Sequence, residues 1–193
     1  MSDFKVSPDR FDRAATLGAY IEGAQKNQDF WRGVRRLARV DRALQDRAAA
    51  VQGQWHLLAL SEDWCTDAVI TLPVIERLIE LAPQLELRVL ARDANPDIMD
   101  AHLTRGTRSI PVVMVLNARF EERGWWGPRP SVLQAWHYEV SGSLEPTARS
   151  RRKREWYARD RGVSTATEVL ELLERAAEPP SVRRDSALGG VAG

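Results

Sequence analysis

The feature that most constrains the fold is Trp55–Ser61, an apolar segment of strand length without a residue charged at neutral pH. Such a segment predicts a strand buried on both faces of a parallel or mixed sheet. A helical pattern follows from Ala68 to about Leu81, and Pro73 inside it is expected to kink the helix. Because a doubly buried strand needs helices on both sides of its sheet, the pattern predicts an α/β fold.

The alternation of strands and helices continues along the chain. Strands are predicted at 85–90, 112–116 and 120–126, with a short helix at 97–103. Arg123 and Gly124 favour an edge position or a β-bulge for the last strand. This order implies a parallel β-α-β unit followed by an antiparallel strand pair, with helical pattern resuming at Ser131.

The first fifty residues are predicted to be helical. One helix has apolar residues at helical spacing over 17–24, and a break follows at 27–29 with Asp29 as N-cap. The next helix is expected to bury a stripe formed by Phe30, Val34, Leu37, Val40 and Leu44.

Four segments follow from these patterns. They are an N-terminal helical extension packed on the core (1–53), a central α/β domain (54–141), a C-terminal helical extension (142–177) and a tail (178–193). The tail has too few apolar groups to pack and is expected to be disordered.

Composition indicates which partners to expect. The net charge is +1, which gives no general attraction to nucleic acid or to anionic membranes. The arginine-rich run at 149–154 is expected to be a solvated helix face rather than a nucleic-acid site. No apolar run approaches the roughly 20 residues that span a bilayer, and no signal sequence is visible. With a single cysteine, Cys65, an intramolecular disulfide is excluded, so a cytoplasmic protein is expected.

The segments around Cys65 resemble the active site of the thioredoxin family. Four elements carry the resemblance, in the family's order and spacing: Trp-Cys-Thr-Asp-Ala at 64–68, Pro73, Ile110-Pro111 and Trp126-Gly127. Glu-Asp-Trp-Cys and Trp-Gly-Pro-Arg-Pro segments further resemble a subgroup of that family with helical extensions. The resemblance covers about residues 55–141 and implies a thioredoxin-like central mixed sheet flanked by helices, with extra helices at both ends.

The resemblance also implies which residues form the site. Cys65 is the expected nucleophile, and Ile110, before an expected cis-proline, is the expected backbone partner of an extended substrate. The other residues expected to line the site are Trp64, Thr66, Asp67, Ala68, Pro111, Trp126 and Gly127. A cysteine at a helix N-terminus has its thiolate stabilised by unpaired N–H groups, which can lower its pKa from about 8.5 to roughly 3.5–7.5. A nearby Asp67 carboxylate opposes that effect.

Two positions depart from the family pattern. Ala68 stands where the resolving cysteine is expected, and Ala59 stands where thioredoxins carry a buried carboxylate. A dithiol mechanism is therefore excluded for the isolated chain. Monothiol thiol–disulfide exchange is predicted, with glutathione or another low-molecular-weight thiol supplying the resolving sulfur and a protein or small-thiol disulfide as partner. A redox sensor and a binding or adaptor protein with an idle cysteine stay open as alternatives, whereas iron–sulfur ligation is disfavoured.

The remaining polar candidates are expected to be structural. His56 is predicted to be a hydrogen-bonded core or edge residue, His102 a surface residue, and His137 a packed or exposed one. Their scattered positions predict no metal site, and no cofactor is expected. Asp93 and Asn95 are expected to cap the next helix. Trp125 and Trp126 suit a groove floor or core closure equally.

Overall fold

The computed structural model describes residues 5–178, and the predicted tail lies, apart from Glu178, outside this range. A five-stranded mixed sheet forms its centre, in the order β1-β3-β2-β4-β5. The strands are β1 (Ala15–Thr16), β2 (Trp55–Ser61), β3 (Leu85–Ala91), β4 (Val112–Asn117) and β5 (Glu122–Trp126). The described helices are α1 (Pro8–Asp12), α2 (Leu17–Gly23), α3 (Gln28–Leu37), α4 (Arg42–Ala50), α5 (Thr66–Ile79), α6 (Pro96–Ala101), α7 (Ser131–Glu139), α8 (Pro146–Asp160) and α9 (Val163–Ala177).

The central strand β2 is the predicted apolar segment, and only His56 among its residues is not buried. It pairs in parallel with β3 and antiparallel with β4, while β4 pairs antiparallel with β5. A register irregularity between Val115 and Leu116 matches the predicted bulge in this last pair. The α/β fold with a mixed sheet and added helices is therefore confirmed.

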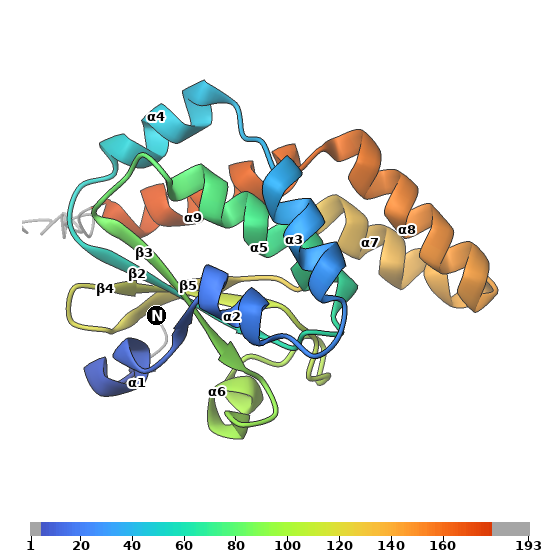
Figure 1. Cartoon of the computed structure of the whole chain (residues 1–193), viewed down its shortest axis with the longest axis horizontal. Coiled ribbons are helices and arrows are strands. Elements are labelled where there is room, and N and C mark those ends of the chain that lie inside the picture. The colour runs from blue at the N-terminus through green and yellow to red at the C-terminus, as the bar shows by residue number, and fades with distance from the viewer. Residues whose placement is uncertain (1–4, 179–193) are drawn as a thin grey trace, which may run out of the picture.

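Helices cover both faces of the sheet (Figure 1). On one face α5 and α9 pack together, with α3 and α4 stacked outside α5. On the other face lie α1 and α6. Within residues 5–178 no helix is both long and apolar enough to cross a membrane.

Strand pairing brings four chain segments to one edge of the sheet. Leu60 near the end of β2 is in register with Leu90 of β3 and with Val112 of β4, and Val113 is in register with Trp126 of β5. The loops after β2, β3 and β5 and the loop before β4 therefore meet at this edge. Cys65 lies in the first of them.

The predicted buried stripe over 30–44 is correct only in part: Val34, Val40 and Leu44 pack against the core, but Phe30 and Leu37 do not. The chain breaks after α3, and Asp41 starts α4 by accepting a hydrogen bond from the Ala43 amide at 2.8 Å. Phe30 and Leu37 are consequently 42% and 68% exposed, whereas Trp31 is fully buried. Asn27, and not Asp29, is the N-cap of α3.

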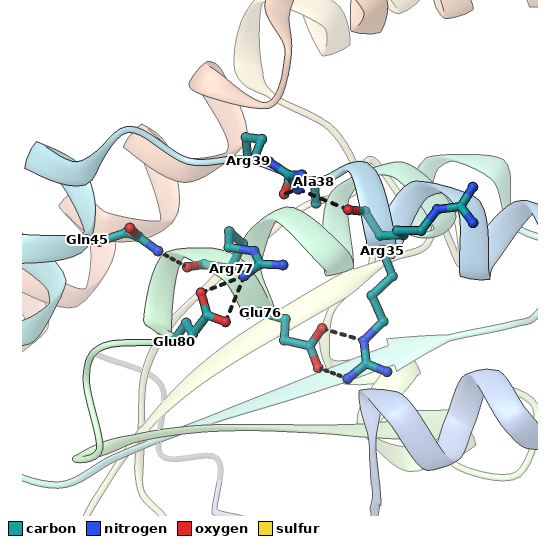
Figure 2. A network of polar contacts seen from close by, with 8 residues as sticks. Arg35, Ala38, Arg39, Gln45, Glu76, Arg77 and Glu80 are labelled. Carbon is teal, nitrogen blue, oxygen red and sulfur yellow. Dashed lines mark hydrogen bonds and ion pairs between the residues drawn. The ribbon is translucent and has the colours of Figure 1, made fainter.

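Polar contacts attach α3 and α4 to α5 (Figure 2). Arg35 of α3 forms a bidentate ion pair with Glu76 of α5, at 2.7 and 2.8 Å. Gln45 of α4 donates to the backbone carbonyl of Arg77 at 2.7 Å, and the Arg77 side chain pairs with Glu80. The N-terminal helices are thus held on the helix that carries Cys65 at its start.

The structure corrects details of the predictions for three further polar residues: His56 packs in the core and Asn95 is the N-cap of α6, but the expected side-chain hydrogen bonds differ. His56 lies stacked on Phe120 with ring centroids 4.3 Å apart, and its Nδ1 has no hydrogen-bond partner within residues 5–178. Asn95 is the N-cap residue of α6, but its side chain makes no capping hydrogen bond. Instead the side-chain Nδ2 donates to the Ala91 carbonyl, and Oδ1 accepts from the Arg10 guanidinium. Asp93 pairs with Arg92 instead of capping α6. His137 is partly buried on α7.

His102 is buried, which corrects its predicted surface position. Only 2% of it is exposed, and its Nε2 lies 2.7 Å from the Glu122 carboxylate while Nδ1 lies 2.6 Å from the Ile98 carbonyl oxygen. Burial lowers the pKa of His102, but the bonds to Glu122 and Ile98 and the charge of Glu122 outweigh it, so the pKa is raised. With both ring nitrogens facing acceptors, the imidazolium form is favoured.

The His102–Glu122 pair predicts a pH-dependent contribution to stability. Because the native pKa of His102 is raised, the stabilisation is complete below its ordinary value of about 6.5 and is lost as pH rises through the native pKa. We expect Glu122→Gln to reduce the free energy of unfolding by about 3 kcal/mol at low pH, and by less above neutrality. Urea unfolding at about pH 5.5 and about pH 8.5 measures this difference; an equal loss at both would contradict it.

Candidate active site

Cys65 is the N-cap residue of α5. Its amide donates to the Glu62 carbonyl at 3.0 Å, and its carbonyl accepts from the Val69 amide at 3.0 Å, which begins the helix. The thiol donates to the carbonyl oxygen of Ile110 at 3.4 Å, and the Ile110–Pro111 peptide bond is cis. The residue is only 7% exposed.

Opposing effects act on the Cys65 thiol. Burial raises its pKa most strongly, and the Asp67 carboxylate raises it further. The amides of Ala68 and Asp67 and the Lys153 ammonium lower the pKa, since all of them stabilise the thiolate. Burial prevails and the pKa is raised, so the activation expected from the helix N-terminus is present but outweighed.

The Asp67 carboxylate is buried in a cluster of polar side chains from three parts of the chain. Its Oδ2 lies 2.9 Å from Arg129 Nε, in the loop after β5, and 3.0 Å from Lys153 Nζ of α8. The Tyr157 hydroxyl, one helical turn beyond Lys153, donates to Oδ1 at 3.1 Å. Burial, and then the Asp67 charge, raise the pKa of Tyr157. Two cations therefore face one carboxylate beside Cys65. The Asp67 side chain points toward Arg129 and Lys153.

A groove of about 350 Å³ opens beside the sulfur. Its lining residues are Trp64, Cys65, Thr66, Asp67, Arg92, Arg108, Ser109, Ile110, Arg129 and Lys153. Trp64 is 43% exposed, and the Arg92 guanidinium lies 5.2 Å from the centre of its ring. The groove thus has one aromatic wall and four cationic side chains.

The residues expected in the site divide into two groups. Trp64, Thr66, Asp67 and Ile110 line the groove with Cys65. The others lie outside the lining: Ala68, Pro111, Trp126 and Gly127. Trp125 and Trp126 suited a groove floor or core closure equally in the sequence, and neither of them lines the groove. The Trp126 indole donates to Glu168 of α9 at 2.7 Å, and Trp125 packs edge-on against His102.

Gly127 allows the loop after β5 to approach the backbone of Pro111. Its φ is +128°, and a Cβ placed on it would lie 2.1 Å from the carbonyl oxygen of Pro111. Only glycine permits this approach of two backbone segments, which keeps the loop after β5, and hence Arg129, close to the start of β4.

Gly127→Ala is therefore expected to reduce the free energy of unfolding by at least about 2 kcal/mol. Gly33→Ala is the matched control, because nothing lies within 4 Å of a Cβ at that helical position. The control is expected to stabilise α3 by about 0.5–1 kcal/mol. Chemical denaturation of both variants tests the contrast, and similar values for the two would contradict it.

The N-terminal helices brace the turn that precedes Cys65. The Asp63 carboxylate accepts from the amides of Gln25 and Lys26, each at 2.8 Å. The Asp63 carbonyl accepts from the indole of buried Trp31 at 3.0 Å. The conformation of the turn thus depends on residues more than thirty positions away in the sequence.

Sequence reasoning missed the cationic lining. Lys153 and Tyr157 lie four residues apart on α8, a spacing that places them on one helix face, but nothing in the sequence relates that face to Asp67. The run at 149–154 does not form a uniform solvated face, because Lys153 is directed into the groove. No group of three or more His, Cys, Asp or Glu that could hold a metal ion occurs within residues 5–178.

Residues 14–144, more than half of the 193, match a family model described as Thioredoxin. The chain belongs to the thioredoxin family. Within this fold Cys65 lies directly before α5 and Pro111 directly before β4.

Two solved structures share the fold. A protein of unknown function from Pseudomonas aeruginosa, PA1234, is 24% identical with a TM-score of 0.68, over 91% of this chain and 99% of that one. An HIV epitope-scaffold is 22% identical with a TM-score of 0.65, over 88% of this chain and 99% of that one. No curated protein matches the sequence. At this identity the likeness concerns the fold alone.

Asp67→Asn is expected to lower the pKa of Cys65, because it removes the negative charge that raises this pKa and leaves the Lys153 ammonium, which lowers it. Alkylation at neutral pH should accelerate by roughly three- to tenfold. Iodoacetamide is the suitable reagent, since it is uncharged and its approach does not depend on the charge of the groove. Asp46→Asn on α4, an exposed aspartate paired with Arg42, is the control and should leave the rate unchanged. A slower reaction of the Asp67 variant would contradict the prediction.

Proposed function

We propose that the protein carries out monothiol thiol–disulfide exchange through Cys65, with a low-molecular-weight thiol as the resolving partner. The observation that supports this most directly is the sulfur's place on the floor of a groove, at the start of α5 and 3.4 Å from the Ile110 carbonyl. A disulfide seated in this groove meets the sulfur beside amides that stabilise its thiolate. A lone thiol of this kind suits a reducing compartment, and we propose the cytoplasm.

The exchange proceeds in two steps. Cys65 releases its proton to solvent, and its thiolate attacks one sulfur of the partner disulfide, whose S–S bond breaks while the other half leaves as a thiolate and takes up a proton. A low-molecular-weight thiolate then attacks the Cys65 mixed disulfide, regenerates Cys65 and forms a new disulfide. After these two steps one half of the partner has left as a thiol and the other half is joined to the small thiol in the new disulfide. A second small thiol that attacks this disulfide completes the reduction of the partner, and the two small thiols are then oxidised to their own disulfide.

The absence of an internal resolving sulfur fits this scheme. Ala68 is fully buried at the position where the family's second cysteine is expected. The mixed disulfide therefore persists until an external thiol arrives. Because the pKa of Cys65 is raised, the first step should accelerate with pH across the neutral range.

A second candidate is a binding or adaptor protein that uses the same groove. The raised pKa and the small exposed area of Cys65 favour it. In that case the sulfur packs against Ile110, and the groove lining alone contacts the partner.

Incubation with oxidised glutathione distinguishes the two functions. We expect a mixed disulfide on Cys65, detected as a mass increase of one glutathionyl group and absent from Cys65→Ser. Reduced glutathione should then release it. Formation should be faster at about pH 8.5 than at about pH 6.5, because the thiolate fraction increases with pH. If no adduct forms at either pH in folded protein, exchange is overturned and the binding function is supported.

A further inference from the structure

We infer that the groove beside Cys65 selects thiol compounds and disulfides that carry a carboxylate or phosphate group close to the sulfur. This inference names the substrate class of the exchange proposed above and rests on it. It rests on the charged side chains that line the groove with Cys65.

The charge balance of the lining carries the inference. Arg92, Arg108, Arg129 and Lys153 line the groove, and Asp67 is the only acidic residue among the lining residues. The carboxylate contacts both Arg129 and Lys153, so this pair of cations keeps one uncompensated positive charge. Arg129 Nε is buried without a well-aligned hydrogen-bond acceptor within residues 5–178, although Asp67 lies within ion-pair distance. The inner part of the groove therefore favours an anion.

The other two arginines add recognition elements to the groove lining. Arg108 forms a bidentate pair with Asp100, at 2.7 and 2.8 Å, and both side chains are exposed. Such an exposed ion pair contributes little free energy. An oxyanion on a bound compound can replace Asp100, because a guanidinium fork fits carboxylate and phosphate equally well. Arg92 is less exposed; it contacts the exposed Asp93 at 2.8 Å and lies over the Trp64 ring.

Two other cavities within residues 5–178 lack this bias. The cavity over β3 combines Arg35 and Arg77 with Glu76, Glu80 and Glu86. The cavity between α4 and α9 has Arg47 beside Glu174 and Glu178. The positive surplus of the groove that contains the sulfur is therefore not a general result of the chain's arginine content.

Size limits the compound. A volume of about 350 Å³ is near the lower end of small-molecule sites, so it suits a short thiol rather than a bulky ligand. With its sulfur at Cys65, the rest of such a compound lies between Trp64 and the cationic side chains. Its acidic group is then within the part of the groove that Arg129 and Lys153 line together.

Three small disulfides of similar length test the charge preference. They are 3,3′-dithiodipropionate, which is anionic, bis(2-hydroxyethyl) disulfide, which is neutral, and cystamine, which is cationic. We expect the anionic probe to form the Cys65 mixed disulfide at least roughly tenfold faster than the neutral one, with cystamine slowest. The preference should weaken in high salt, which screens the cations.

Arg108→Gln should reduce the ratio of the rate with the anionic probe to the rate with the neutral probe by roughly threefold, because it removes one of the cations that line the groove. Arg119→Gln is the matched control, since Arg119 is also exposed and paired with a carboxylate, Glu121, but lies in the β4–β5 turn at the opposite end of the sheet. Equal rates for the three probes would overturn the inference while leaving the exchange itself intact.

Thioether probes, which bind but cannot react, distinguish failure of the exchange reaction from failure of the anion selection. Thiodipropionate and thiodiglycol are compared by calorimetry, and binding of the anionic thioether alone supports anion selection even if no disulfide forms. Equal or absent binding of both, with no reaction of any disulfide, overturns the inference. Competition by inorganic phosphate against acetate at constant ionic strength distinguishes a phosphate from a carboxylate as the favoured group.

Discussion

The buried carboxylate of Asp67 joins the parts of the protein that make the site. It stands in the first turn of α5, two residues after the cysteine, and receives Arg129 from the loop after β5 and Lys153 and Tyr157 from α8. A buried charge is tolerated only when it is paired and hydrogen-bonded. Here the pairing also fixes α8 against the start of α5. One acid thus links α8 to the start of α5 and offsets part of the positive charge of the groove.

The pKa of Cys65 is set by two opposing effects, burial of the sulfur and its position at the start of a helix. The amides at the start of α5 and the ammonium of Lys153 stabilise the thiolate, whereas burial stabilises the thiol more strongly. In this balance the protein keeps a protected thiol that donates to Ile110. A ligand that brings a disulfide into the groove changes the surroundings of the sulfur, and the nearby cations then act on the developing charge.

The central fold was predictable because its signals are local. The strand at 55–61 was predicted to the residue, since a run of apolar residues without charge identifies a strand buried on both faces. The strand at 85–91 was predicted to within one residue, and in it apolar residues alternate with the charged Glu86 and Arg88. The site was predictable as far as the family motif reaches, which includes Cys65 and Ile110. Its cations were not, because Lys153 meets Asp67 across 86 residues of sequence. The same reason hid the contact of His102 with Glu122, and the capping of α4 by Asp41 explains why Trp31 is buried where Phe30 was expected.

The depth of Cys65 has a consequence for self-association. An unpaired cysteine on a protein surface readily forms a covalent dimer on oxidation. A disulfide between two copies requires the two Cα atoms to approach within about 7 Å. Cys65 is only 7% exposed in the groove that Trp64 also lines, and two such grooves would bring their surplus positive charges together. The shape and charge that admit a small acidic disulfide therefore keep the chain from crosslinking to a second copy through its single cysteine.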